Sequence, residues 1–192
     1  MDLTRVSPIA GILCVVSFIT LWVLAAVVDG HWVLGENTLS DLGVCGSNAA
    51  QLCFNGGCAI AGLLAVIFAM GLIERKGAWR ICGIMMALAG VMLIGVGIVN
   101  LSYGEAHVID ATAHGALAAI SMAISVYADW KDGHKRMVAY TCILIIACAI
   151  VTFTQKFEVF EPFGVCVVMA WALGQSIKLL GEAKAAEAQA TE

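Results

Sequence analysis

Two histidines and an aspartate in the segment EAHVIDATAHG form the pattern best suited to chemistry in this 192-residue chain. His107, Asp110 and His114 are three and four residues apart, so a helix places them within about 60° of one another on one face. Imidazole and carboxylate groups bind Zn²⁺, and a zinc-bound water can attack an ester or an amide. The spacing therefore predicts all three residues as candidate metal ligands, and Asp110 and His114 also as candidate catalytic residues.

A second polar group lies in the segment NTLSDLG, residues 37–43. Leu39 and Leu42 are three residues apart, which is a spacing that places both side chains on one helix face. The pattern predicts a short interfacial helix that Asn37 caps and Gly43 ends.

Such a helix would bring Ser40 and Asp41 toward His107 at the membrane surface. We therefore predict Ser40 and Asp41 as further catalytic residues, with the Ser40 hydroxyl orienting a substrate or stabilising an oxyanion. Three asparagines are candidate ligand-binding residues of the same outer pocket: Asn37, Asn55 and Asn100.

Three interpretations of these polar residues are open at this point. In the first, a divalent metal such as zinc activates water against an ester or amide of a membrane lipid held between helices. In the second, the residues form a buried hydrogen-bond network that fixes one helix to the outer loop, and the protein has a structural or interaction role without enzymatic activity. In the third, the cluster belongs to a small transporter or sensor.

The elements that carry these residues are predicted to be membrane helices. Hydrophobic residues make up 61% of the chain and charged residues only 12%, a balance that excludes a disordered chain and argues against a cytosolic enzyme. A formal net charge of −4, with no run of more than two basic residues, argues against nucleic acid as a partner. We predict an all-α, multi-pass protein of the cell membrane with six transmembrane helices at about 7–28, 50–73, 79–101, 108–128, 137–154 and 160–180.

Lysine and arginine residues indicate the orientation of these helices. Nine of the ten fall on the side of the N-terminus if all six segments cross the membrane, and only Lys156 falls on the other side. Because cytoplasmic loops carry an excess of Lys and Arg, both termini are predicted to be cytoplasmic. Residues 181–192 are predicted to form a short polar cytoplasmic tail that extends the sixth helix briefly and then frays.

Small residues within the predicted helices are expected to allow close helix packing. Gly62, Gly90, Gly95 and Gly115 are among them. Faces of this kind also permit a homo-oligomer.

Two cysteines flank the first outer loop, Cys45 and Cys53. Disulfides persist on the outer side of a membrane, so a bridge between them and two free thiols are both compatible with the sequence.

Several short motifs resemble the DUF998 family of six-helix membrane proteins. The resemblance rests on residues 37–43, on Phe54-Asn55 near the start of the second helix and on His114-Gly115 in the fourth. It implies a six-helix fold and no particular reaction, because the family name denotes unknown function. It also implies that the following residues form one outer site: Asn37, Ser40, Asp41, Asn55 and His114.

The polar layout is also loosely similar to that of the CREST hydrolases, seven-helix proteins that use serine, aspartate and histidines around a metal. The chain has one predicted helix fewer and lacks their paired histidines on a last helix.

Overall fold

Each apolar segment folds as a helix, because a backbone within a bilayer has no water to satisfy its N–H and C=O groups. The computed structural model describes residues 3–190. Its helices are, in chain order, α1 (Leu3–Asp29), the 3₁₀-helix η1 (Ser40–Gly43), α2 (Asn48–Glu74), α3 (Ala78–Ile98), the 3₁₀-helix η2 (Leu101–Tyr103), α4 (Glu105–Lys131), α5 (Lys135–Thr154) and α6 (Phe157–Ala190). Six of them, α1 to α6, are long and apolar enough to cross a membrane. The predicted all-α fold with six transmembrane helices is confirmed.

The observed helices differ from the predicted ones chiefly at their polar ends. α4 continues to Lys131 rather than stopping near residue 128, and α6 continues to Ala190. The part of the predicted tail that the structure describes, residues 181–190, is therefore helical, while 191 and 192 lie outside the described residues. Alanine and glutamate favour a helix here, and glutamates of this extension pair with Arg5 of α1 and with Arg75, the residue that follows α2.

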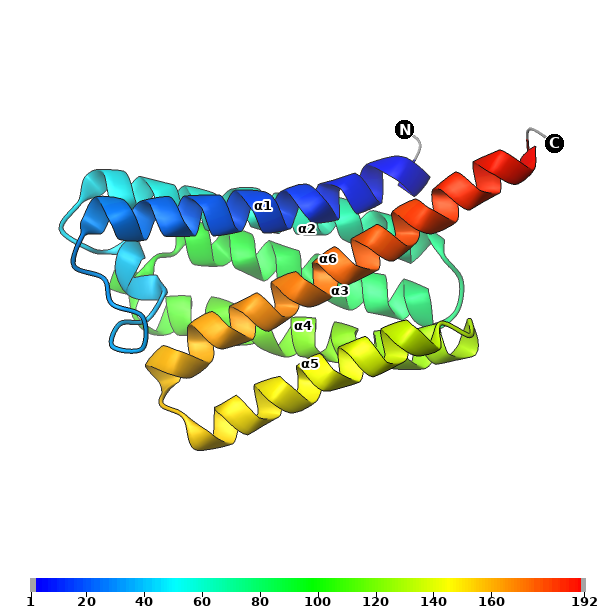
Figure 1. Cartoon of the computed structure of the whole chain (residues 1–192). Coiled ribbons are helices and arrows are strands. Elements are labelled where there is room, and N and C mark those ends of the chain that lie inside the picture. The colour runs from blue at the N-terminus through cyan, green and yellow to red at the C-terminus, as the bar shows by residue number, and fades with distance from the viewer. Residues whose placement is uncertain (1–2, 191–192) are drawn as a thin grey trace.

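The helices pack in sequence order from α1 to α4, and α6 crosses this group diagonally (Figure 1). α6 contacts α1, and α5 contacts α4 and α6. The first turn of α1 and the last turn of α6 lie at one end of the bundle, which we call the terminal end. The opposite end, the loop end, carries residues 30–47, η2 and the α5–α6 turn (Figure 1). The predicted orientation makes the terminal end cytoplasmic.

Glycines bring neighbouring helices into close contact. A Cβ atom at Gly62 would lie 2.6 Å from the carbonyl oxygen of Gly90, so α2 and α3 approach too closely for a side chain there. Gly95 of α3 lies directly against the Asp110 carboxylate of α4. The packing role predicted for these three glycines is confirmed. The same prediction is wrong for Gly115, where a Cβ would have no contact within 4 Å.

The outward-facing side of α5 is apolar. Thr141 is its one buried residue, and large apolar side chains along the helix are exposed, among them Ile143, Ile146, Ile150 and Phe153. Lipid tails are the natural surroundings of such a surface.

Candidate functional site at the loop end

A polar cluster at the loop end joins three elements. Ser40 opens η1, His107 lies in the first turn of α4 and Glu161 lies near the start of α6. His107 Nε2 is 2.9 Å from Ser40 Oγ, and Glu161 Oε1 is 3.1 Å from the same oxygen. Ser40 is 7% exposed and His107 3%. The Ser40 hydroxyl therefore lies between an imidazole and a carboxylate in a site almost closed to solvent.

Backbone groups fix both partners of Ser40. His107 Nδ1 is 2.7 Å from the carbonyl oxygen of Val99, and because a carbonyl only accepts, Nδ1 carries a hydrogen and donates it. This contact holds the ring with Nε2 toward Ser40. On the other side, the Leu39 N–H donates to Glu161 Oε2 at 2.6 Å.

The Ser40 hydroxyl has one hydrogen and can donate it to only one of these two partners. When Ser40 donates to ionised Glu161, His107 Nε2 does not receive that hydrogen. When Glu161 is protonated, it can donate to Ser40, and Ser40 can then donate to neutral Nε2. The second arrangement is the one in which His107 can accept the Ser40 proton.

Asp41, predicted as a catalytic residue, shapes the loop that presents Ser40. Its Oδ2 accepts from the Thr38 N–H at 2.7 Å, and its own N–H donates to Thr38 Oγ1 at 3.2 Å. Trp32 Nε1 donates to the carbonyl oxygen of Thr38 at 2.7 Å. These paired contacts hold the turn immediately before η1, so Asp41 acts here on the backbone around Ser40.

The predicted short helix is present as η1 and ends at Gly43, but Asn37 does not cap it. Leu39 is the residue that precedes η1, and Asn37 Oδ1 accepts instead from the Val33 N–H at 2.9 Å. The cap prediction failed because the helix is one turn of 3₁₀ type and starts later than the apolar spacing suggested.

The other two asparagines also contact nearby backbone. Asn55 Nδ2 donates to the carbonyl oxygen of Gly43 at 3.0 Å and so ties α2 to the end of η1. Asn100 Oδ1 accepts from the Ser102 N–H at 3.1 Å and caps η2. Ligand binding by Asn37, Asn55 and Asn100 stays a prediction.

His107, Asp110 and His114 share one face of α4, as predicted, but they lie at different depths. A rise of about 1.5 Å per residue separates the two histidines by roughly 10 Å along the axis. His114 Nδ1 is 2.9 Å from the carbonyl oxygen of Ala89, on α3. Within residues 3–190 no three His, Cys, Asp or Glu side chains are grouped as a metal site would require. The predicted metal role of these three residues has no support from their arrangement.

Cys45 and Cys53 are free thiols in this structure. Burial raises the pKa of the Cys45 thiol. The protonated Sγ is 3.3 Å from the carbonyl oxygen of Leu42, to which it donates.

Glu161 is the site residue that sequence reasoning missed. Nothing in the sequence showed that it would contact Ser40, 121 positions away. An ionisable residue near the end of an apolar helix was the available signal.

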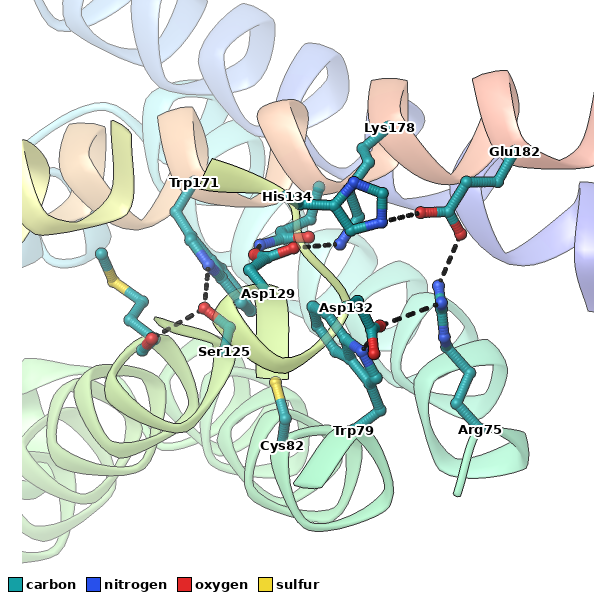
Figure 2. A network of polar contacts seen from close by, with 12 residues as sticks. Arg75, Trp79, Cys82, Ser125, Asp129, Asp132, His134, Trp171, Lys178 and Glu182 are labelled. Carbon is teal, nitrogen blue, oxygen red and sulfur yellow. Dashed lines mark hydrogen bonds and ion pairs between the residues drawn. The ribbon is translucent and has the colours of Figure 1, made fainter. Parts of the chain in front are cut away.

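A second polar network, also missed, lies at the terminal end (Figure 2). Asp129 of α4 is fully buried, and its Oδ1 is 2.7 Å from Lys178 Nζ of α6. Its Oδ2 accepts from Gln175 Nε2 at 2.8 Å. The Lys178 ammonium also lies 4.0 Å from the centroid of the Trp79 ring, a cation–π contact.

Closer to the end of the bundle, the network connects two turns with α6 (Figure 2). Arg75 Nη1 is 2.8 Å from Glu182 Oε2, and Arg75 Nη2 is 3.6 Å from Asp132 Oδ2. Trp79 Nε1 donates to Asp132 Oδ2 at 2.7 Å, and His134 Nε2 is 3.1 Å from Glu182 Oε1. Each charge in this group has an opposite partner, which is the pattern of a structural network.

Comparison with known proteins agrees with the fold and gives no information on function. No curated protein and no solved structure matches the chain. One family model, described as a protein of unknown function (DUF998), matches residues 12–177. With this match over most of the chain and six helices able to cross a membrane, the protein is an integral membrane protein that belongs to the DUF998 family.

Proposed function

We propose that this protein is a membrane-embedded serine hydrolase that cleaves an ester of a membrane lipid at the loop end. Ser40 is the nucleophile and His107 the general base. The observation that carries the proposal is the 2.9 Å contact of Ser40 Oγ with His107 Nε2, in a ring whose Nδ1 is held by the Val99 carbonyl. A nucleophile, a base within hydrogen-bond reach and a group that orients the base are the parts that acyl transfer needs.

The reaction proceeds in two halves. Ser40 Oγ attacks the ester carbonyl carbon while His107 Nε2 accepts the hydroxyl proton. The tetrahedral intermediate then collapses, the bond to the leaving alcohol breaks, and Nε2–H gives the proton to that oxygen. Water attacks the resulting acyl-Ser40 with His107 again as base, which releases the fatty acid and restores the hydroxyl.

A lipid is the substrate class because of where Ser40 lies. His107 stands in the first turn of α4, where the apolar segment begins, so the pair is near the boundary between lipid headgroups and tails. The glycerol ester bonds of membrane lipids lie at this depth. The exposed apolar faces of the bundle place the same lipids around the protein.

The proposal is tested by hydrolysis of a fluorogenic phospholipid ester in proteoliposomes. The wild type is expected to release fatty acid, and Ser40→Ala to reduce the rate about 10³-fold or more, as loss of a nucleophile does in serine hydrolases. Ser102→Ala is the matched control, because Ser102 is an exposed serine at the same end, and this variant should hydrolyse at the wild-type rate.

Two results would contradict the proposal. One is hydrolysis by Ser40→Ala at the wild-type rate. The other is a wild type without activity in which Ser40→Ala only lowers the melting temperature, which would assign the cluster a structural role. Zinc bound by His107, Asp110 and His114 stays a separate prediction, tested by elemental analysis of the wild type and His114→Ala.

A further inference from the structure

A cavity of about 470 Å³ lies at the terminal end, remote from Ser40. It is bounded by the first turns of α1, the last turn of α2 and the C-terminal part of α6. The cavity exists because α6 crosses the bundle at an angle and continues past the start of α1 (Figure 1). Its volume falls in the range of about 300–1,000 Å³ that is typical of small-molecule sites.

The cavity lies at the level of the lipid headgroups. The apolar run of α1 begins directly after Arg5, and that of α2 ends before Glu74 and Arg75. Charged residues that flank an apolar helix mark the membrane surface. A phospholipid headgroup therefore has access to this cavity from the bilayer.

Both signs of charge line the cavity. Arg75 provides a guanidinium, and Glu182 and Glu187 provide carboxylates. Arg75 contacts Glu182 at 2.8 Å, and Arg5 pairs with Glu187. Arg75 also lies 3.6 Å from Asp132 Oδ2. A ligand that carries both a negative and a positive group would therefore find a group of opposite charge for each in this lining.

We propose that this cavity binds the headgroup of a phospholipid that carries a primary ammonium, as phosphoethanolamine does. The Arg75 guanidinium contacts the phosphate, for which its fork of N–H donors is well suited. The Glu182 and Glu187 carboxylates accept hydrogen bonds from the ammonium. The glycerol part lies against the apolar wall at Leu3 and Pro8.

The lining distinguishes this headgroup from other common ones. A quaternary ammonium, as in phosphocholine, has no N–H to donate and is usually bound by aromatic side chains, and none of the lining residues that the structure describes is aromatic. An anionic headgroup without an ammonium, as in phosphatidylglycerol, would lie next to the Glu182 and Glu187 carboxylates. It has no ammonium to donate hydrogen bonds to them.

Native mass spectrometry of the full-length protein, purified in detergent, tests this proposal. The protein is titrated with phosphatidylethanolamine, phosphatidylcholine and phosphatidylglycerol of identical acyl chains. The fraction with one bound lipid is expected to be about tenfold higher for phosphatidylethanolamine, the ratio that one charge-assisted hydrogen bond provides.

A pair of neighbouring variants locates the site. Ala186 lines the cavity and Ala185, also exposed, does not. Ala186→Trp fills the cavity and is expected to abolish the preference, whereas Ala185→Trp adds the same side chain to another face of α6 and should keep it. Both substitutions are at exposed positions, and equal melting temperatures would show that both variants are folded.

The proposal is overturned if the wild type retains the three lipids equally or prefers phosphatidylglycerol. It is also overturned if both tryptophan variants keep the preference. Neither outcome bears on hydrolysis at Ser40, because the two sites lie at opposite ends of the bundle.

Discussion

Ser40 has one hydrogen to donate and two acceptors within reach, His107 Nε2 at 2.9 Å and Glu161 Oε1 at 3.1 Å. The acceptor that receives this hydrogen decides whether His107 can act as a base. A protonated Glu161 donates to Ser40 and so directs the Ser40 hydrogen toward His107. In the proposed reaction Glu161 is therefore a positioning residue, and its protonation state would set the direction of the hydrogen bond that the reaction needs.

Glu161→Gln tests whether Glu161 acts by donating a hydrogen bond to Ser40, because it replaces one carboxyl oxygen with an NH₂ group. Its amide oxygen can still accept from the Leu39 N–H, while its NH₂ group donates to Ser40, as protonated Glu161 would. We expect this variant to hydrolyse the lipid ester at a rate near that of the wild type. If Glu161→Gln is as inactive as Ser40→Ala, Glu161 itself accepts the Ser40 proton and the assignment of His107 as base is wrong.

Glu161→Ala, unlike Glu161→Gln, removes both hydrogen-bonding groups of the side chain. It leaves the buried Leu39 N–H without its acceptor, which costs about 1–3 kcal/mol. We expect lower activity and a lower melting temperature, measured in the same detergent as for Glu161→Gln. A fully active and stable Glu161→Ala would show that the contact with Leu39 does not hold η1 in place.

At the level of elements, α4 carries polar side chains along its whole buried face. The series His107, His114, Ser121, Ser125 and Asp129 extends over about 33 Å at 1.5 Å per residue, close to the thickness of the hydrocarbon core. Each of these side chains has a polar partner: His114 contacts the Ala89 carbonyl, Ser121 donates to the Cys82 carbonyl, and Ser125 accepts from Trp171 Nε1. Hydrogen bonds to α3 and α6 therefore fix α4 at several depths.

The Asp129–Lys178 pair is expected to be the most sensitive of these contacts. Asp129→Ala leaves the Lys178 ammonium, whose side chain is 8% exposed, without its carboxylate partner. Removal of one member of a buried pair typically costs about 3–5 kcal/mol, whereas replacement of both by apolar residues is often neutral. Thermal unfolding in detergent should show a large loss for Asp129→Ala and recovery in the double variant Asp129→Leu/Lys178→Met.

Glu74→Ala is the control for this measurement, because Glu74 is exposed at the same end of the bundle. Its melting temperature should match the wild type. A double variant no more stable than Asp129→Ala would contradict the view that the unpaired ammonium causes the loss.

At the level of the whole molecule, hydropathy was sufficient to predict six helices, because each must satisfy its own backbone within the bilayer. Contacts between helices could not be predicted in the same way. The predicted fourth helix ended at about residue 128 and so left out Asp129, which is fully buried within α4. Lys178 was counted only as a cytoplasmic cation, yet it pairs with Asp129 from 49 positions away.

In the candidate site, too, the polar residues could be predicted from the sequence but the contacts between them could not. Ser40 and His107 were recognised because polar residues near an outer membrane surface are conspicuous in an apolar sequence. Their contact with each other and with Glu161 depends on how η1, α4 and α6 meet. Helical periodicity placed Asp110 and His114 on the His107 face correctly, but it could not show that His114 bonds to the backbone of α3.

The orientation of the bundle is a further prediction, derived from the distribution of Lys and Arg. Glu36→Cys introduces a thiol at the loop end and Ala185→Cys at the terminal end. In intact cells, a membrane-impermeant maleimide should add to Glu36→Cys beyond the level of the parent chain. It should add to Ala185→Cys only after permeabilisation. The reverse pattern would place the termini outside the cell.

The most direct test of Ser40 as a nucleophile is a fluorophosphonate adduct located by mass spectrometry. The purified protein is incubated with the reagent, digested and mapped. We predict a phosphonyl group on the peptide that contains Ser40 in the wild type and in Ser102→Ala, and no adduct there in Ser40→Ala or His107→Ala. An unmodified Ser40 in a folded wild type, or equal labelling in His107→Ala, would contradict the proposed serine hydrolase.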